Sequence, residues 1–352
     1  MLISDFDYEL PEELIAQHPL ARRDASRMLV VSREEGAWRD CSFSEFPSEL
    51  RAGDALVVNN TRVFPARLAG RREPTGGRVE LLLVRRREDV GAHIWEALAR
   101  PARRLDAGAR LAFGDGRLRA EVLSATDDGV GRVVRFDSEG DFDALVEEFG
   151  QMPLPPYIKR EGFDLAARAE DRERYQTVYA ASRGAIAAPT AGLHFTPHVL
   201  ESSRARGVRV AALTLHVGYG TFAPVRAEEL ASHRVAPERF EIGEEAAEAI
   251  NSTRAGGGRV VAVGTTTVRA LESAAVEKGF VRAGRGETGL TITPGYQFRA
   301  VDALLTNFHL PRSSLLVLVS AFAGRELVLA AYRHAVAARY RFYSYGDCMF
   351  IV

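Results

Sequence analysis

The strongest constraint on the fold of this chain is a change of hydrophobic pattern at a proline-rich segment, QMPLPPYIKR, which occupies residues 151–160. Proline lacks a backbone N–H and restricts the residue before it, so this segment cannot form regular helix. Before it come short alternating runs separated by Gly-Gly, Gly-Asp-Gly and Asp-Asp-Gly turns, namely Arg78–Arg87, His93–Arg100, Arg117–Leu123 and Gly131–Phe136. Alternation between glycine turns predicts a small antiparallel β domain. A short helix is expected to follow, from Asp141 to Gly150.

After the proline-rich segment, short apolar runs alternate with helical patterns. The predicted strands are Gly184–Ala188, Val208–Leu215, Arg259–Val263 and Ala303–Thr306. One helix is predicted from Thr196-Pro197 to Gly207, and a second from about Thr266 to Lys278, where Gly279 stops it. This alternation predicts a largely parallel α/β layout, either open or barrel-like. We therefore expect a large α/β domain built from residues 1–65 and 151–352, with residues 66–150 inserted as the small β domain.

The bulk composition predicts a globular protein of the cytoplasm. The chain has 352 residues, of which 46% are hydrophobic and 26% charged, which suits a full core and argues against extensive disorder. The N-terminus, MLISDFDYEL, lacks a basic segment followed by an apolar one, so no signal peptide is expected. The longest apolar run, Ser313–Ala323, is about half of what a bilayer span needs. Two cysteines form neither a disulfide framework nor a zinc motif.

The charge distribution is uneven. The formal net charge of −1 argues against a generally basic nucleic-acid-binding protein, yet residues 66–124 contain 13 arginines against 8 acidic residues. Arginines cluster there at residues 85–87 and 100–104, which predicts phosphate contacts with RNA through Arg85, Arg86, Arg103 and Arg104. The alternative is that these are ordinary surface cations, because the chain has only two lysines and uses arginine in their place.

Polar residues stand where each predicted strand ends. Thr190 and His194 follow the first strand, and Thr214 and His216 end the second. Residues 264–267, a glycine and three threonines, follow the third strand, and the NFH triplet at 307–309 follows the fourth. Because the carboxyl ends of parallel strands collect on one face, these four motifs are predicted to form one polar site.

The motifs suit an anionic or flat ligand. Helix-start amides and hydroxyls in GTTTVR suit a carboxylate, and the glycines of HVGYGTF allow close backbone approach. NNTR, at 59–62, can bind a carboxylate or phosphate, or make a polar turn. The terminal YRFYSYGDCMFIV predicts a last strand with one polar face. The predicted substrate-binding residues are Asn59, Asn60, Arg62, Thr190, Gly218, Thr221, Gly264, Thr265, Thr266, Arg269, Asn307, Arg341, Tyr343 and Asp347.

Several common enzyme classes are disfavoured. The chain has no G-x-x-x-x-G-K motif and no convincing G-x-G-x-x-G fingerprint, which argues against standard nucleotide-phosphate and dinucleotide enzymes. His194 and His198 have metal-ligand spacing, but Pro197 lies between them and no carboxylate accompanies them. Zinc normally takes three or four convergent protein ligands, so no metal site is predicted.

Ten ordered stretches of the chain resemble the S-adenosylmethionine:tRNA ribosyltransferase-isomerase family of queuosine biosynthesis. They include NNTRVFPARL, MPLPPYIKR, GAIAAPTAGLHF, TLHVGYGTF, AVGTTTVRALES, VDALLTNFHLP and YRFYSYGDCMFI, and together they run from Asp5 to Ile351. The chain departs from the family pattern at Ala236, where a second histidine is often found after the position of His233, and at Tyr219, where a smaller or aliphatic residue is usual. The resemblance implies a large α/β domain, barrel-like or with a mixed sheet, and an inserted antiparallel β-barrel domain.

The resemblance also implies a reaction. The acceptor would be a tRNA carrying 7-aminomethyl-7-deazaguanine at the wobble position, and S-adenosylmethionine would be a co-substrate that donates its ribosyl group. The products would be epoxyqueuosine in the tRNA, adenine and methionine, formed without a metal or redox cofactor by a protein expected to be monomeric. The sulfonium acidifies the neighbouring 5′-carbon, so a weak base can remove its proton. We expect His194, His216 or His309 to handle a proton, because histidine can do so near neutral pH.

Two rival classes are compatible with the motifs taken singly. One is an α/β enzyme that acts on a free nucleoside or sugar phosphate and has no need of tRNA. The other is an RNA-binding protein without catalytic activity. The histidines at the strand ends and the GTTTVR turn speak against the second class.

Overall fold

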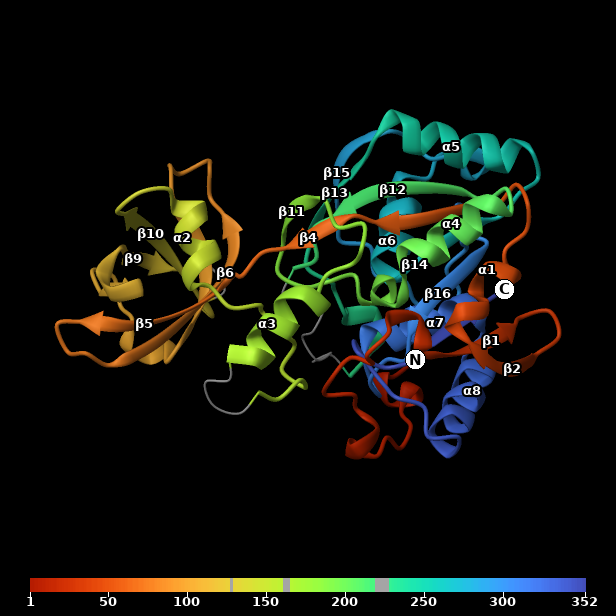
Figure 1. Ribbon diagram of the computed structural model, residues 1–352, viewed down its shortest axis with the longest axis horizontal. Coiled ribbons are helices and arrows are strands. Elements are labelled where there is room, and N and C mark those ends of the chain that lie inside the picture. The colour runs from red at the N-terminus through yellow and green to blue at the C-terminus, as the bar shows by residue number, and fades with distance from the viewer. Residues whose placement is uncertain (127–128, 161–164, 219–227) are drawn as a thin grey trace.

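The computed structural model describes residues 1–126, 129–160, 165–218 and 228–352. Figure 1 shows two layered parts, a small barrel and a large sheet flanked by helices, with α3 (Leu165–Arg174) between them. The two crossings of the chain between these parts lie near β4 (Thr61–Val63) and near the proline-rich segment. A parallel pair, β4 with β11 (Ser182–Ala185), stands beside the large sheet.

The large sheet has nine strands. Their order is β15 (Gly284–Thr288), β13 (Glu238–Ile242), β12 (Arg209–Leu215), β3 (Ala55–Asn59), β14 (Val260–Val263), β16 (Ala303–Asn307), β17 (Cys348–Ile351), β1 (Arg27–Ser32) and β2 (Ala37–Ser42). The four central strands β12, β3, β14 and β16 are parallel to one another. Antiparallel pairing joins them to β13 and β15 on one side and to β17 on the other, where β1 pairs with β17 in parallel and β2 pairs with β1 in the antiparallel sense. The sheet ends in two edge strands, so the mixed-sheet form of the predicted large domain is confirmed and the barrel-like form is wrong.

Alternating side chains divide the large sheet into two packed faces. Leu29 and Val31 of β1 point into one core, and Met28 and Val30 point into the other. This is the period of two that a strand buried on both faces must show. The first face packs against α5 (Glu244–Ala255), α6 (Thr265–Ala274), α7 (Ser314–Ala323) and α8 (Arg325–Ala337). The second face packs against α1 (Phe46–Glu49) and α4 (Pro197–Ala205), where Thr196 caps the helix by accepting a hydrogen bond from the Val199 amide.

The barrel is closed and antiparallel. Its strands run in the order β10 (Gly131–Ser138), β7 (Ile94–Arg100), β6 (Arg78–Arg86), β5 (Arg67–Glu73), β8 (Arg110–Phe113) and β9 (Leu118–Ala125), and β9 pairs with β10 to close the ring. The barrel has its own core of inward-facing Leu, Val, Ala and aromatic side chains. Helix α2 (Phe142–Phe149) packs on it and is capped by Asp141, whose carboxylate accepts from the Ala144 amide at 2.7 Å. The predicted α/β fold with an antiparallel β-barrel is confirmed.

Two local predictions are wrong, and strands β5 and β8 were not predicted. Helix α6 ends at Ala274 and not at Lys278, because the chain turns back there to bridge Ala275 with Val281. The polar half of the predicted last strand is a turn, because Tyr343 has a φ of 72° and the Asp347 amide bonds the Arg341 carbonyl at 2.8 Å. Only Cys348–Ile351 is strand, and it is buried throughout.

No single helix in the described ranges is long and apolar enough to cross a bilayer, and the neighbours α7 and α8 satisfy that test only as a pair bent by 116°.

Candidate functional site at the strand ends

A cavity of about 420 Å³ lies beyond the carboxyl ends of the central parallel strands. Its wall is built from residues 188–191, residues 264–266 after β14, residues 306–315 from the end of β16 to the start of α7, and the side chains of Tyr157 and Tyr343. Ligand-binding pockets usually measure roughly 300–1,000 Å³, so this cavity suits a nucleoside-sized molecule. Among the predicted substrate-binding residues, Thr190, Gly264, Thr265, Thr266, Asn307 and Tyr343 line it.

Two helices begin at the cavity. Helix α6 starts directly after Gly264, whose φ of 88° favours glycine, and α7 starts after Ser313, whose hydroxyl accepts from the Leu316 amide at 3.2 Å. Helix N-termini carry unpaired N–H groups and partial positive charge. Among the described residues that line the cavity there is one cation, Arg312, and no carboxylate. Arg312 already pairs with Asp7, so it is the two helix starts that favour an anionic group on the ligand.

A chain of hydrogen bonds fixes Asn307 in the cavity wall. Its side-chain oxygen accepts from the Thr190 hydroxyl at 3.1 Å, and its side-chain nitrogen lies 3.2 Å from His194 Nε2 and 3.2 Å from the Tyr343 carbonyl. On the far side, His194 Nδ1 lies 2.7 Å from the Ser26 hydroxyl. An amide N–H₂ group can only donate, so His194 Nε2 accepts and Nδ1 carries the proton. Both ring nitrogens of His194 are thus engaged behind the wall.

His309 is the predicted histidine that lines the cavity. Its Nε2 lies 2.8 Å from the Thr306 hydroxyl, and its backbone N–H donates to the Tyr332 hydroxyl at 3.0 Å. Burial lowers the pKa of His309 to about 3. Burial, with the charges of Arg23 and Arg341, lowers the pKa of His194 to about 3 as well. Both imidazoles are therefore neutral at physiological pH.

His216 lies apart from the cavity wall. It follows β12, its Nδ1 lies 2.8 Å from the Thr61 hydroxyl, and burial lowers its pKa below the ordinary value. Its ring also packs on Gly184, where a side-chain β-carbon would lie 2.8 Å from the imidazole. The polar site predicted from four strand ends thus separates into a cavity group and a second group around His216 and Thr61.

The polar atoms of some predicted substrate-binding residues form hydrogen bonds within the protein itself. The Asn59 side chain bonds both backbone groups of Leu215, at 2.9 and 3.0 Å, and thereby ties β3 to β12. The Asn60 side-chain oxygen accepts from Thr214 at 2.7 Å. Both oxygens of the buried Asp347 accept backbone N–H groups at 2.8 Å, from Arg27 and Arg341. These three side chains therefore stabilise the protein around the site through hydrogen bonds within the chain.

Arg269 is also committed to the protein. Its guanidinium forms a buried ion pair with Glu238 and donates to the carbonyls of Leu290 and Thr288 at 3.1 Å. The other Glu238 oxygen accepts from the Gly218 amide at 2.8 Å. The predicted contact of Arg269 with a ligand carboxylate is replaced in this structure by a contact with a protein carboxylate. Thr221 and Tyr219 lie outside the described residues.

A second, much larger space of about 1650 Å³ separates the barrel from the large sheet. Barrel residues such as Arg67 and Arg100 face residues 150–156, the first turns of α3, and Gly218 across it. Pro156 lines this cleft and also the 420 Å³ cavity, and the neighbours Val217 and Gly218 line one space each. The cleft and the cavity therefore lie next to each other at the proline-rich segment and share Pro156 in their walls.

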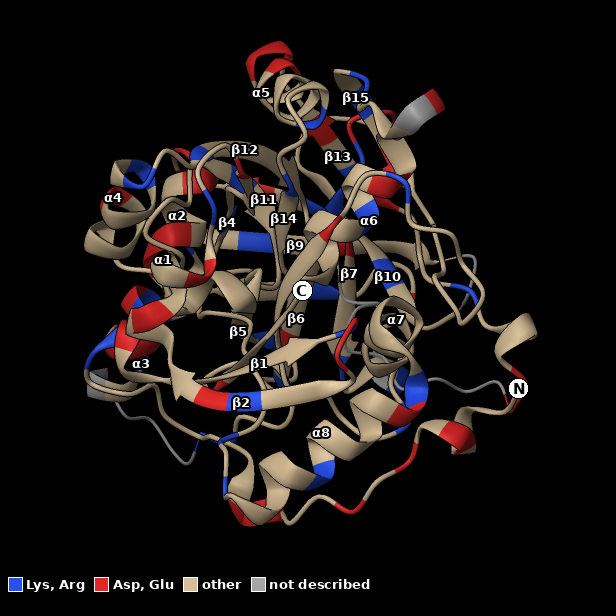
Figure 2. Ribbon diagram, turned by 90° about the vertical axis from the view of Figure 1, so that its right-hand side faces the viewer, with Lys and Arg blue, Asp and Glu red and all other residues tan. Residues whose placement is uncertain are grey.

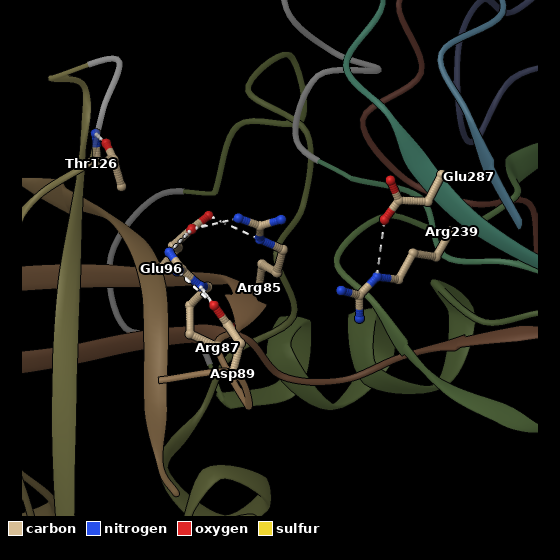
Figure 3. A network of polar contacts seen from close by, with 8 residues as sticks. Arg85, Arg87, Asp89, Glu96, Thr126, Arg239 and Glu287 are labelled. Carbon is tan, nitrogen blue, oxygen red and sulfur yellow. Dashed lines mark hydrogen bonds and ion pairs between the residues drawn. The ribbon is translucent and has the colours of Figure 1, made fainter. Parts of the chain in front are cut away.

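Two of the four predicted RNA-contacting arginines of the barrel, Arg85 and Arg86, have carboxylate partners. Arg85 and Arg87 share Glu96, at 2.7 and 2.9 Å, and Arg87 also pairs with Asp89 (Figure 3). Arg86 lies 3.8 Å from Glu88. Arg103 is exposed, as is Arg62 on β4, and the side chain of Arg104 is not described. Figure 2 shows acidic and basic positions interspersed along the elements, in keeping with the net charge of −1.

Tyr157 is a wall residue that the sequence interpretation missed. It lies in the proline-rich segment, its ring centroid is 4.0 Å from that of Tyr343, and its hydroxyl lies 2.6 Å from the Ser344 hydroxyl. A tyrosine within the proline-rich segment was the available signal, but the segment was predicted only not to form helix. Across the described ranges, no three His, Cys, Asp or Glu side chains gather as a metal site.

The fold and the cavity define an α/β enzyme with a nucleoside-sized site at its strand ends and an attached β-barrel. Residues 3–351 match the protein family described as queuosine biosynthesis protein, and the chain belongs to this family. The resemblance found in the sequence is thereby confirmed.

Relatives of known name cover the whole chain. It is 54% identical to the S-adenosylmethionine:tRNA ribosyltransferase-isomerase of Symbiobacterium thermophilum and 53% identical to that of Pelotomaculum thermopropionicum, over 352 residues and 100% of both chains in each case. It is also similar to the crystal structure of S-adenosylmethionine tRNA ribosyltransferase from Thermotoga maritima, with a TM-score of 0.55 and 38% identity over 99% of this chain and 100% of that one.

Proposed function

We propose that this chain transfers the ribosyl group of S-adenosylmethionine to 7-aminomethyl-7-deazaguanine at the wobble position of a tRNA and isomerises it, giving epoxyqueuosine, adenine and methionine. The family membership and the names of full-length relatives support this activity. No metal or redox cofactor is part of the proposal. A monomeric, cytoplasmic enzyme remains our expectation from the sequence.

One observation carries the placement of S-adenosylmethionine. The cavity is flanked by the starts of α6 and α7, and its described lining residues include no carboxylate. The methionine part of S-adenosylmethionine ends in a carboxylate, which helix N-termini favour. Thr265 and Ser314 stand at this end, and Tyr157 stands at the end that meets the cleft. We place the methionine carboxylate at the two helix starts and the ribosyl group nearer the cleft.

The cleft is the space proposed for the RNA. Its volume of about 1650 Å³ is about four times that of the cavity, and the two spaces share Pro156 in their walls. Enzymes that modify a base in RNA extrude it toward the reacting group. A deazaguanine turned out of the anticodon loop would enter the cavity from the cleft side and present its aminomethyl group to the ribosyl carbon.

The three histidines expected to handle a proton differ in where they lie relative to the cavity. His194 uses both nitrogens behind the wall, and His216 lies outside the lining. His309 lines the cavity as a neutral imidazole, so it is our candidate for the group that takes the proton from the carbon beside the sulfonium. His194 would act through Asn307, by holding the amide that faces the ligand.

The test uses purified protein, S-adenosylmethionine and an anticodon stem-loop that carries the aminomethyl-deazaguanine. A mass gain of the RNA that matches the cyclopentanediol epoxide, with one adenine released per RNA modified, is expected. RNA that is bound but unchanged would overturn the proposal in favour of a non-catalytic RNA-binding protein. Adenine release from S-adenosylmethionine without RNA modification would point instead to an enzyme of free nucleosides.

A further inference from the structure

Three arginines, Arg23, Arg174 and Arg341, gather around residues 18–23. Arg23 donates to the backbone carbonyls of Leu193 at 3.3 Å and Glu173 at 3.1 Å. Arg174, at the end of α3, donates to the carbonyls of Leu20 and Ala21 at 2.7 and 3.3 Å. Arg341 donates to the His18 carbonyl. Each half-buried guanidinium thus has carbonyl dipoles as its partners.

None of these three guanidinium groups lies within 4.0 Å of a carboxylate among the described residues. The acidic residues nearby have other partners, since Asp24 pairs with Arg22 and Asp171 pairs with Arg160. Arg174 Nε and Arg341 Nη1 are buried and have no hydrogen-bond partner in the described part of the chain. A buried donor without a partner is costly, and a ligand oxygen that pairs with it removes this cost.

Repulsion between the positive charges of Arg23 and Arg174 adds to the cost of burying them. Burial, together with the charge of Arg174, lowers the pKa of Arg23, and burial lowers the pKa of Arg341. The charges of Glu173 and Asp347 act in the opposite direction on Arg23 and Arg341, but neither carboxylate lies within 4.0 Å of these guanidinium groups. Half-buried cations without an ion-pair partner favour an anion, because an anion offsets both the burial and the repulsion. Arginine suits phosphate in particular, since its fork of N–H donors matches the oxygens of that group.

The small volume of the crevice beside these arginines limits what can bind there to one small chemical group of a ligand. Arg23, Arg174 and His194 line a crevice of about 20 Å³ with Pro19 and Ser344. By the same measure one water molecule needs about 10–15 Å³, so the crevice cannot hold a nucleoside. It has room for one or two oxygens of a phosphate that stays attached to a larger molecule outside.

The crevice adjoins both parts of the proposed active site. Ser344 lines the crevice and the 420 Å³ cavity, and His194 links the crevice to Asn307 in the cavity wall. His18, whose carbonyl binds Arg341, lines the cleft. A polymer in the cleft with one nucleotide in the cavity would therefore carry its backbone past the three arginines.

We propose that Arg23, Arg174 and Arg341 form a site for one backbone phosphate of the RNA substrate, close to the nucleotide that reacts. The inference rests on the proposed function, because that function supplies the RNA. The site fixes the register of the RNA strand, while the cavity selects the base. The cluster Arg85–Arg87 of the barrel, whose three members have carboxylate partners, has no equivalent role.

The experiment measures the affinity of the full-length protein for the unmodified anticodon stem-loop, without S-adenosylmethionine, at several salt concentrations. Loss of one phosphate contact lowers the slope of log affinity against log salt by about 1. We expect Arg341→Gln and Arg23→Gln each to weaken binding about tenfold and to lower the slope by about 1. Arg85→Gln is the matched control in the barrel and should leave both quantities unchanged.

The melting temperature and the S-adenosylmethionine affinity show whether each variant is folded. Should Arg23→Gln fail to fold, Arg23→Lys keeps the charge but not the fork, and it should weaken binding while the salt slope stays near that of the wild type. Folded variants with wild-type RNA affinity and slope would overturn the proposal. So would a loss in which Arg85→Gln matches Arg341→Gln.

Two further arms separate this inference from the proposed function and from a free anion. Wild-type protein that binds the stem-loop through these arginines but never changes its mass would refute the ribosyl transfer and leave the phosphate site standing. The other arm measures the melting temperature with inorganic phosphate. If phosphate raises the melting temperature of the wild type but not of Arg341→Gln, and the substitution leaves RNA affinity unchanged, the crevice binds a small anion and the RNA contact is overturned.

Discussion

The barrel and the strand-end region of the large sheet use charged residues in opposite ways. In the barrel, arginines lie at the surface next to carboxylates, as in the Arg85, Arg87 and Glu96 network (Figure 3). At the strand ends, charged and polar groups are buried, and they are either fully bonded to the protein, as Arg269 is to Glu238, or left with free donors, as Arg341 is.

This difference shows why local charge along a sequence is a poor guide to a binding surface. The barrel segment has the larger local excess of arginine, but hydrogen-bonded pairing across adjacent strands brings Glu96 of β7 opposite Arg85 of β6. The arginines at 23, 174 and 341 are far apart in sequence and gain their importance only when the fold brings them together. The cluster Arg85–Arg87 and the arginines at 23, 174 and 341 therefore differ in whether a carboxylate lies within 4.0 Å, and not in their charge.

The largest expected effect on stability is at the strand ends. Glu238→Ala removes one partner of a buried ion pair and leaves Arg269 uncompensated, so we expect a loss of about 3–5 kcal/mol in the free energy of unfolding. Urea denaturation measures this, with Glu96→Ala in the barrel as the control. Equal losses in the free energy of unfolding for the two variants would show that buried and surface ion pairs do not differ in this protein.

The next effect is on turnover. His309→Gln should lower the rate of RNA modification by about 100-fold, since a positioned acid–base group contributes at least that much. S-adenosylmethionine binding should change little, because Gln can still pair with the Thr306 hydroxyl. His216→Gln, outside the cavity, is the matched control. Wild-type turnover by His309→Gln would remove this histidine from the proposed chemistry.

A smaller effect concerns pH. His194 and His309 have folded-state pKa values of about 3, below the unfolded value of about 6.5, so the unfolded chain binds more protons between these limits. Their contribution to stability is complete above pH 6.5 and is lost as the pH falls toward 3. We expect the free energy of unfolding to drop by roughly 1–2 kcal/mol per histidine between pH 7 and pH 5. Denaturation curves of His309→Gln should show a shallower drop, and an identical slope would contradict the assignment.

The smallest effect is predicted in the barrel. Arg85→Gln should change the free energy of unfolding by about 0–1 kcal/mol, because exposed ion pairs are screened by solvent and Arg87 still holds Glu96. Melting curves at low and high salt test this. A loss above this range would mean that the surface network supports the barrel more than its exposure suggests.

The sequence predicted the parts of the site that depend on local pattern. The turn at Gly264 and the residues Asn307 and His309 could be placed because each follows a short apolar run, and parallel strands bring such ends together. The fold class followed from the same alternation. The closed ring of the barrel was implied by the family resemblance rather than by spacing.

What the sequence could not predict depends on contacts between distant segments. Asp347 and Arg269 were expected to meet a ligand, but their partners Arg27 and Glu238 lie far away in sequence and satisfy them first. The polar alternation at residues 341–347 resembled a strand, but the positive φ of Tyr343 makes it a turn. Tyr157 was missed because a proline-rich sequence excludes helix but does not indicate which other residues the segment contacts.

The central claim is that the cavity at the starts of α6 and α7 binds the carboxylate end of S-adenosylmethionine. The most direct test compares the S-adenosylmethionine affinity of Ser314→Asp and Ser314→Asn in the absence of RNA. A carboxylate at a helix start stabilises the helix, so both variants should fold. We expect Ser314→Asp to bind at least about tenfold more weakly, through like-charge repulsion in a buried wall, and Ser314→Asn to bind like the wild type. Wild-type affinity in folded Ser314→Asp would show that the carboxylate binds elsewhere and would contradict the account.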